Sequence, residues 1–173
     1  MENSIEKSNV LVKLGDLCFP EKTNLLCAVV GAGIVITIFD TERRCGGMCY
    51  YIKPLRNNPK ETSTLFACPS IIGLLNMLLG TGSKLKYLEA QLYGGAANQK
   101  AEGYINGLGN QNVNVAKEIL DLQKVRIVGA GTGGTYGRKV VFDTASGETV
   151  IAKVDNIRSS DWYLPLVTPA NQN

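Results

Sequence analysis

Residues 25–52 read LLCAVVGAGIVITIFDTERRCGGMCYYI, three apolar runs separated by two turns. The first turn is glycine-rich, Gly31-Ala32-Gly33, and the second is polar, Asp40–Arg44. Apolar runs that do not alternate with polar residues are typical of strands buried on both faces. We therefore expect three central strands, at residues 25–30, 34–39 and 48–52.

Two helical patterns and several shorter strand patterns make up the rest of the chain. Pro69 suits the first turn of a helix that continues to Leu79 and that Gly80 or Gly82 closes. A second helix is expected at 112–122. Further strands are expected at 10–14, 87–93, 125–128, 139–142 and 149–154, with a hairpin turn at 143–147. Strands grouped in this way predict an α+β fold, a mixed β-sheet sandwich flanked by helices.

The composition limits the size of the protein and the classes of partner. A chain of 173 residues, 45% hydrophobic and 19% charged, fits one folded domain, which we place at residues 1–157 with a tail at 158–173. A net charge of +3 predicts no nucleic-acid partner. Two uncharged stretches, at 23–39 and 62–83, are too short or too interrupted for membrane insertion. Five cysteines without a signal segment indicate reduced thiols in the cytoplasm.

The expected helix that begins at Pro69 is apolar around most of its circumference, because Asn76 is its single polar side chain between Ser70 and Thr81. A helix of this kind is buried, or it carries a contact face for another molecule. The alternatives are a deep-core helix, a face that pairs with a protein partner or a second copy of the chain, and a face covered by the C-terminal segment that contains Trp162.

The chain contains no histidine, which excludes Ser-His-Asp and Cys-His catalytic arrangements and metal sites that need imidazole. Cys45 and Cys49 have the spacing of a zinc knuckle, but no second close pair exists. Gly129–Gly134 fits the G-x-G-x-x-G pattern of dinucleotide-binding loops, which requires a helix to follow. Here the residues of another strand follow, so we expect a glycine loop between strands and no cofactor.

Five motifs in order carry a resemblance to a known family. They are the glycine turn at 31–33, Cys45-Gly-Gly-Met-Cys-Tyr50, Leu88-Glu-Ala-Gln-Leu-Tyr-Gly-Gly-Ala96, Leu108-Gly-Asn-Gln-Asn-Val113 and Thr132-Gly-Gly-Thr-Tyr-Gly-Arg138. From about Val10 to Val154 the chain resembles CheD, the chemoreceptor glutamine deamidase family of bacterial chemotaxis. The resemblance implies a sandwich fold like that of toxin deamidase domains and other cysteine hydrolases. It also implies a role in chemotaxis, with a chemoreceptor or a CheC-type phosphatase as the partner.

The catalytic positions that the resemblance implies are all changed in this chain. The cysteine nucleophile of the family falls on Gly33, and its histidine base falls on Tyr50. The threonine that orients the histidine falls on Cys27. Gly33 has no side chain, and the phenol of Tyr50, with an ordinary pKa near 10, is a poor base at neutral pH.

Three functional hypotheses follow, and each names its own residues. The first is a catalytically inactive CheD-like protein that binds a chemoreceptor helix or a phosphatase through Gly31, Ala32, Gly33 and Tyr50. The second is an active deamidase that uses a relocated cysteine such as Cys27. The third is a nucleotide-binding module through Gly129–Gly134, and a structural protein unrelated to chemotaxis is a further alternative. The motif order predicts that Gly33 and Tyr50 meet at one mouth of the domain.

Overall fold

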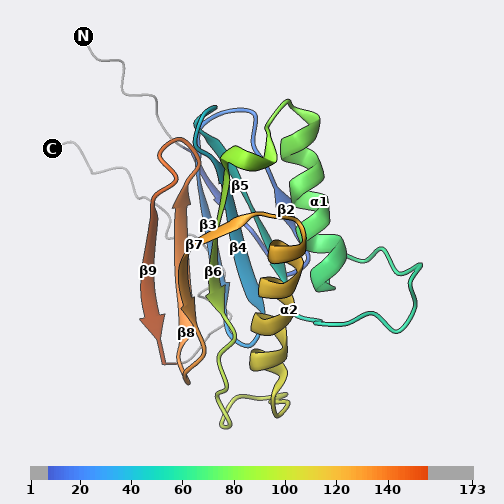
Figure 1. Ribbon diagram of the computed structural model, residues 1–173. Coiled ribbons are helices and arrows are strands. Elements are labelled where there is room, and N and C mark those ends of the chain that lie inside the picture. The colour runs from blue at the N-terminus through green and yellow to red at the C-terminus, as the bar shows by residue number, and fades with distance from the viewer. Residues whose placement is uncertain (1–7, 156–173) are drawn as a thin grey trace, which may run out of the picture.

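The computed structural model describes residues 8–155, which form three layers: two β-sheets face to face, and two helices against the outer face of one sheet (Figure 1). The elements are β1 Ser8–Leu11, β2 Leu17–Cys18, β3 Asn24–Val30, β4 Ile34–Asp40, β5 Cys45–Tyr51, α1 Ala67–Gly80, the 3₁₀ turn η1 Leu85–Tyr87, β6 Leu88–Gly94, α2 Leu108–Leu122, β7 Arg126–Thr132, β8 Gly137–Asp143 and β9 Thr149–Val154. The expected tail at 158–173, with Trp162, lies outside the described residues.

Both sheets are mixed, which confirms the expected α+β sandwich. One sheet has four strands in the order β1-β3-β8-β9, and the other has five in the order β2-β5-β4-β6-β7. The β1/β3 and β6/β7 pairs are parallel, and the other pairs are antiparallel. No helix within residues 8–155 is long and apolar enough to cross a membrane.

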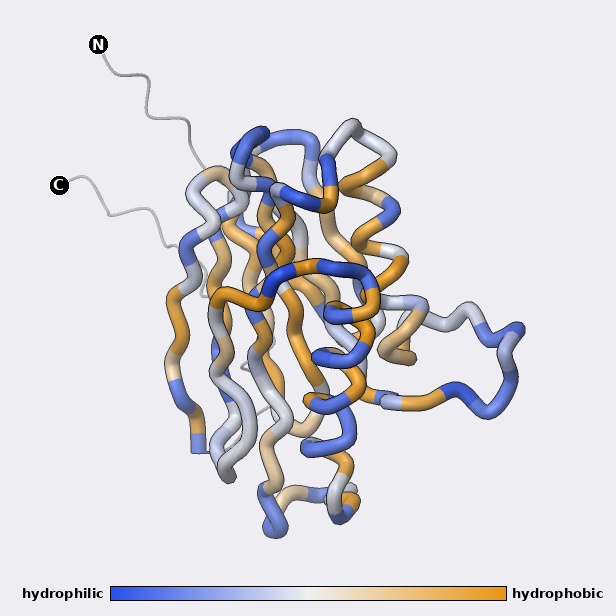
Figure 2. The backbone as a smooth tube through the Cα atoms, viewed as in Figure 1, coloured by the Kyte–Doolittle hydropathy of each residue, from blue (hydrophilic) through white to orange (hydrophobic). Residues whose placement is uncertain are grey.

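Two hydrophobic cores hold the layers together, one on each face of the five-stranded sheet. Ile36, Cys49 and Tyr51 face the helices, whereas Val35, Met48 and Tyr50 face the four-stranded sheet. This division follows from the pleat of a strand, in which successive side chains point to opposite faces. Figure 2 shows the result as apolar colour along the central strands and hydrophilic colour at the turns. The prediction of strands buried on both faces is confirmed for β4, in which every residue is buried, but not for β3, in which Leu25 and Cys27 are only half-buried.

The glycine turn at Gly31–Gly33 joins strands of two different sheets and does not close a hairpin. β3 belongs to the four-stranded sheet and β4 to the five-stranded sheet, so the chain crosses from one layer to the other at this turn. The polar turn after Asp40 does close a hairpin, between β4 and β5. The expected β8–β9 hairpin is also confirmed.

Several expected boundaries were wrong. The first strand ends at Leu11 rather than at Leu14, and the short strand β2 was not expected at all. Helix α2 begins at Leu108, four positions before the expected start, because Gly107 supplies the left-handed N-cap residue. Tyr87 belongs to η1 rather than to the following strand. Both helices lie on the same sheet, which leaves the outer face of the four-stranded sheet without a helix in the described part of the chain.

Helix α1 is mostly a core helix. Ile71, Leu74, Leu75 and Leu78 are buried, and the half-buried Ile72 and Leu79 also pack against the core. Met77, 38% exposed, is the large apolar side chain of α1 that remains on the surface. The predicted contact with a partner or a second copy stays a prediction.

Candidate functional site

One end of the sandwich carries a cavity of about 520 Å³. The turn at 31–33, the ends of β5 and β6, the loop at 95–107 and the turn between β7 and β8 all converge there, at the lower end of the molecule in Figure 1. The lining includes Gly31, Ala32, Gly33 and Tyr50, the four residues named from the sequence as a binding site. The prediction that Gly33 and Tyr50 meet at one mouth of the domain is therefore confirmed.

Gly33 and Tyr50 are packed so closely that Gly33 cannot carry a side chain without movement. A Cβ on Gly33 would lie 2.5 Å from the main-chain oxygen of Tyr51 and 2.9 Å from Cε2 of Tyr50. The first of these contacts is to backbone, which cannot rotate away as a side chain can. The backbone positions of β4 and β5 therefore require a glycine at position 33, whether or not the site is catalytic.

Asn112 links helix α2 by hydrogen bonds to the floor of the cavity, which is formed by Gly31, Ala32, Gly33 and Ile52. Its side chain is buried, and its Nδ2 donates hydrogen bonds to the carbonyl oxygens of Ala32 (3.0 Å) and Ile52 (2.8 Å). The hydroxyl of Tyr51 donates in turn to the main-chain oxygen of Asn112 (2.6 Å). The sequence places Asn112 within a helix, but a lone asparagine gives no signal for this structural role.

Arg138 stabilises the β7–β8 turn beside the cavity. Its guanidinium is buried and donates hydrogen bonds to three main-chain oxygens, those of Gly133 (2.8 Å), Tyr136 (3.1 Å) and Gly94 (3.3 Å). The β7–β8 turn is thereby tied to the end of β6. Desolvation lowers the pKa of Arg138 from its usual value, but an arginine remains charged at physiological pH.

Cys27 is not brought to the site. It pairs with Val141 in the four-stranded sheet, and its neighbours Leu26 and Ala28 face the core that contains Tyr50. Because strand residues alternate, the Cys27 thiol lies on the other face of that sheet, and burial raises its pKa. All five cysteines fall within residues 8–155, and none lines the cavity. A nucleophile relocated to Cys27 therefore has no direct access to the cavity.

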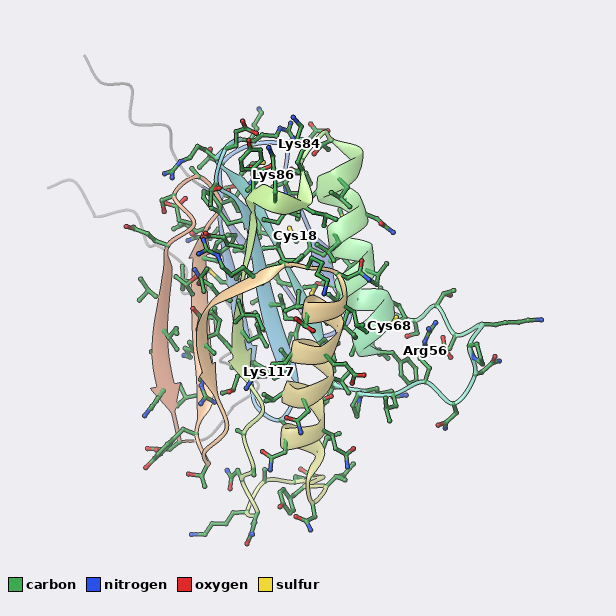
Figure 3. All side chains as sticks on the ribbon, viewed as in Figure 1. Cys18, Arg56, Cys68, Lys84, Lys86 and Lys117 are labelled. Atoms are coloured by element: carbon green, nitrogen blue, oxygen red, sulfur yellow. The ribbon has the colours of Figure 1, made fainter. Side chains whose placement is uncertain are left out.

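The other cysteines are also remote from the cavity floor. Cys49 faces the helices, on the opposite side of β5 from Tyr50, as the alternation of strand residues predicts. Cys68 lies beside Arg56, with 3.7 Å between its Sγ and Nη2, at the base of the loop between β5 and α1 (Figure 3). No group of three or more possible metal ligands occurs within residues 8–155.

The glycine-rich motif has a structural role. Gly129 to Thr132 belong to β7, which is longer than expected, and a turn at Gly133–Gly134 leads directly into β8. A Cβ on Gly131 would lie 3.1 Å from the Tyr93 ring, so the glycine leaves room for that side chain between the sheets. Since a strand follows and not a helix, the arrangement that holds a dinucleotide phosphate is not formed.

Burial controls the electrostatics of β5. Desolvation raises the pKa of Cys49 to about 12, and it raises the pKa values of Tyr50 and Tyr51 well above 10.0. All three groups are therefore protonated and neutral near neutral pH. The phenol of Tyr50 cannot act there as a general base.

These buried groups predict that stability falls in alkali. In the unfolded chain the thiol and the phenols ionise near their ordinary pKa values of 9.0 and 10.0, whereas the folded protein retains their protons. The stability contributed by the neutral groups is complete below pH 9 and is lost as the pH rises above it. Each group contributes a slope of about 1.4 kcal/mol per pH unit.

Urea unfolding at a series of pH values up to about 11 measures this slope. Tyr51→Phe leaves one fewer group to titrate, so we expect a shallower decline than in the wild type. A free energy of unfolding that stays level in the wild type through this range would contradict the assignment of buried, neutral groups.

The two mixed sheets, the helices on one face and the cavity at the strand ends define an α+β sandwich of the kind that the sequence resemblance implied. The family model for CheD, described as chemotactic sensory transduction, matches residues 53–153. This is more than half of the chain, and the protein belongs to the CheD family.

Curated relatives agree with this assignment. A probable chemoreceptor glutamine deamidase CheD 2 from Geobacter sulfurreducens is 29% identical over 147 residues, covering 85% of this chain and 91% of the relative. A probable chemoreceptor glutamine deamidase CheD from Methanosarcina barkeri is 30% identical over 127 residues, covering 72% and 83%. A third, from Thermococcus kodakarensis, is 29% identical over 153 residues, covering 85% and 94%.

Proposed function

We propose that this protein is a non-catalytic member of the CheD family, which binds a chemoreceptor segment at the cavity without deamidating it. The observation that carries the proposal is the contact between Gly33 and Tyr50. At the two positions that the resemblance aligns with nucleophile and base, the chain has no side chain and a buried neutral phenol.

Cysteine-dependent deamidation needs groups that the cavity does not offer. A thiolate attacks the amide carbon, ammonia leaves with a proton from an acid, and water then hydrolyses the thioester to a carboxylate. No cysteine lines the cavity, and the chain has no histidine to move the proton. These absences support the proposed lack of turnover.

The surroundings of the cavity support protein binding. Ile105, 61% exposed, belongs to the cavity lining, and Tyr136, 46% exposed, follows the lining residue Thr135. Exposed apolar side chains around a concave site are typical of interaction surfaces. The relatives named as chemoreceptor deamidases make a chemoreceptor the first candidate partner. We place this interaction in the cytoplasm, and a CheC-type phosphatase is the other partner to test.

The binding test uses a chemoreceptor fragment and isothermal titration calorimetry. Ile105→Glu introduces a charge into the cavity, and we expect it to weaken binding at least roughly tenfold. Val150→Glu is the matched control, because Val150 is 70% exposed on β9 and does not line the cavity. Absence of binding by the wild type, or equal weakening by both variants, would contradict a receptor site at the cavity.

A further inference from the structure

The cavity lining also indicates which side chain of the partner enters it. We infer that the site accepts an apolar side chain, of the leucine or methionine kind, in the place where the relatives' names imply a glutamine. This inference rests on the proposed function, because it concerns the occupant of the same cavity.

The apolar character of the lining is the first argument. Five apolar or aromatic residues from three separate segments of the fold line the cavity: Leu14, Tyr50, Ile52, Ile105 and Leu108. The charged lining residues, Lys100, Glu102 and Asp155, are all exposed. Asn98, Tyr104 and Thr135 add neutral polar groups to the lining, and the apolar surface of the cavity is the larger part.

The hydrogen bonding of the floor is the second argument. The carbonyl oxygen of Gly31 accepts from the Ala96 N–H at 2.9 Å, and that of Gly33 accepts from the Gly95 N–H at 2.8 Å. The carbonyl oxygens of Ala32 and Ile52 both accept from Nδ2 of Asn112. These four acceptors already have partners within the protein. Oδ1 of Asn112 has no hydrogen-bond partner among the described residues, but it is buried and Asn112 does not line the cavity, so an incoming amide NH₂ would have to share an acceptor.

The chemistry of the two occupants then differs. A glutamine amide that leaves water for this site loses hydrogen bonds, and the four floor carbonyls can replace them only by sharing with their present donors. A leucine side chain of similar length loses none and gains from the removal of apolar surface from water. The site of an active deamidase must hold an amide, whereas this floor favours a side chain without polar atoms.

The probe is a helical chemoreceptor fragment that carries a glutamine at its contact position, together with its Gln→Leu variant. We expect the leucine form to bind about tenfold more tightly, as measured by calorimetry. In Ile105→Asn, which adds an amide partner to the lining, we expect this preference to shrink. The control Val150→Asn changes an exposed residue outside the cavity and should retain the full preference.

The possible outcomes separate the inference from the proposed function. If the glutamine form binds as tightly as the leucine form, or more tightly, the inference is wrong and the receptor site stands. If neither form binds, the proposed function fails and the inference fails with it. An equal loss of preference in Ile105→Asn and Val150→Asn would also overturn the assignment of the preference to this cavity.

Discussion

Gly94→Ala is expected to lower the free energy of unfolding by about 4 kcal/mol, a large part of the stability of a domain of this size. Gly94 has a φ of +123°, which side chains rarely adopt. A Cβ there would overlap the main-chain oxygen of Gly33 and approach Cγ2 of Val30 to 2.8 Å. The end of β6 would therefore have to move away from the turn at Gly31–Gly33.

Gly82→Ala is the matched control for Gly94→Ala. Its φ is +100°, but nothing lies within 4 Å of the position of a Cβ, so the substitution adds backbone strain without a collision. We expect a loss of about 1 kcal/mol by urea unfolding. Equal losses in the two variants would show that the close approach of Gly94 to Gly33 does not hold in solution.

Gly33→Cys, which returns a thiol to the family position, is expected to cost about 3 kcal/mol of stability. The new Cβ would lie 2.5 Å from the Tyr51 oxygen and 2.9 Å from the Tyr50 ring. Adding Tyr50→His removes only the second of these contacts, because the Tyr51 oxygen belongs to the backbone. We therefore expect the double variant to recover part of the stability and to show no deamidase activity.

Gly80→Ala serves as the control for Gly33→Cys. Gly80 is the last residue of α1, and nothing lies within 4 Å of the position of its Cβ. Alanine is the better helix former, so stability should be unchanged or slightly higher. If Gly33→Cys proved as stable as Gly80→Ala in urea, the site would have room for a thiol. The inferred collision of a Cβ at position 33 with Tyr50 and Tyr51 would then be wrong.

The sequence was sufficient to bring Gly33 and Tyr50 together, because the motif order placed one at the start of a strand and the other near the end of a neighbouring strand. It did not show that β3 and β4 belong to different sheets. A glycine turn between two apolar runs looks alike whether it closes a hairpin or crosses between layers, since only the pairing partners differ. The partners that place the two strands in different sheets, β8 for β3 and β6 for β4, lie far along the chain.

The roles of Asn112 and Arg138 could not be predicted for a similar reason. Asn112 donates to the main-chain oxygen of Ala32 and Arg138 to that of Gly94, residues distant in sequence, and such acceptors leave no trace in residue type. For Gly129–Gly134 the sequence was sufficient to predict a glycine loop between two strands, because strand residues and not a helix follow it. It did not show that Gly131 makes room for the Tyr93 ring of β6, a constraint that arises only when the strands pair.

Ammonia release from a chemoreceptor fragment, measured with the purified wild-type protein, tests the central claim most directly. The Geobacter sulfurreducens relative, named as a probable deamidase, provides the comparison under the same conditions. The account predicts that the fragment binds to this protein and that ammonia stays at the level of the protein-free blank. Release that grows in proportion to the concentration of the wild-type protein would contradict it.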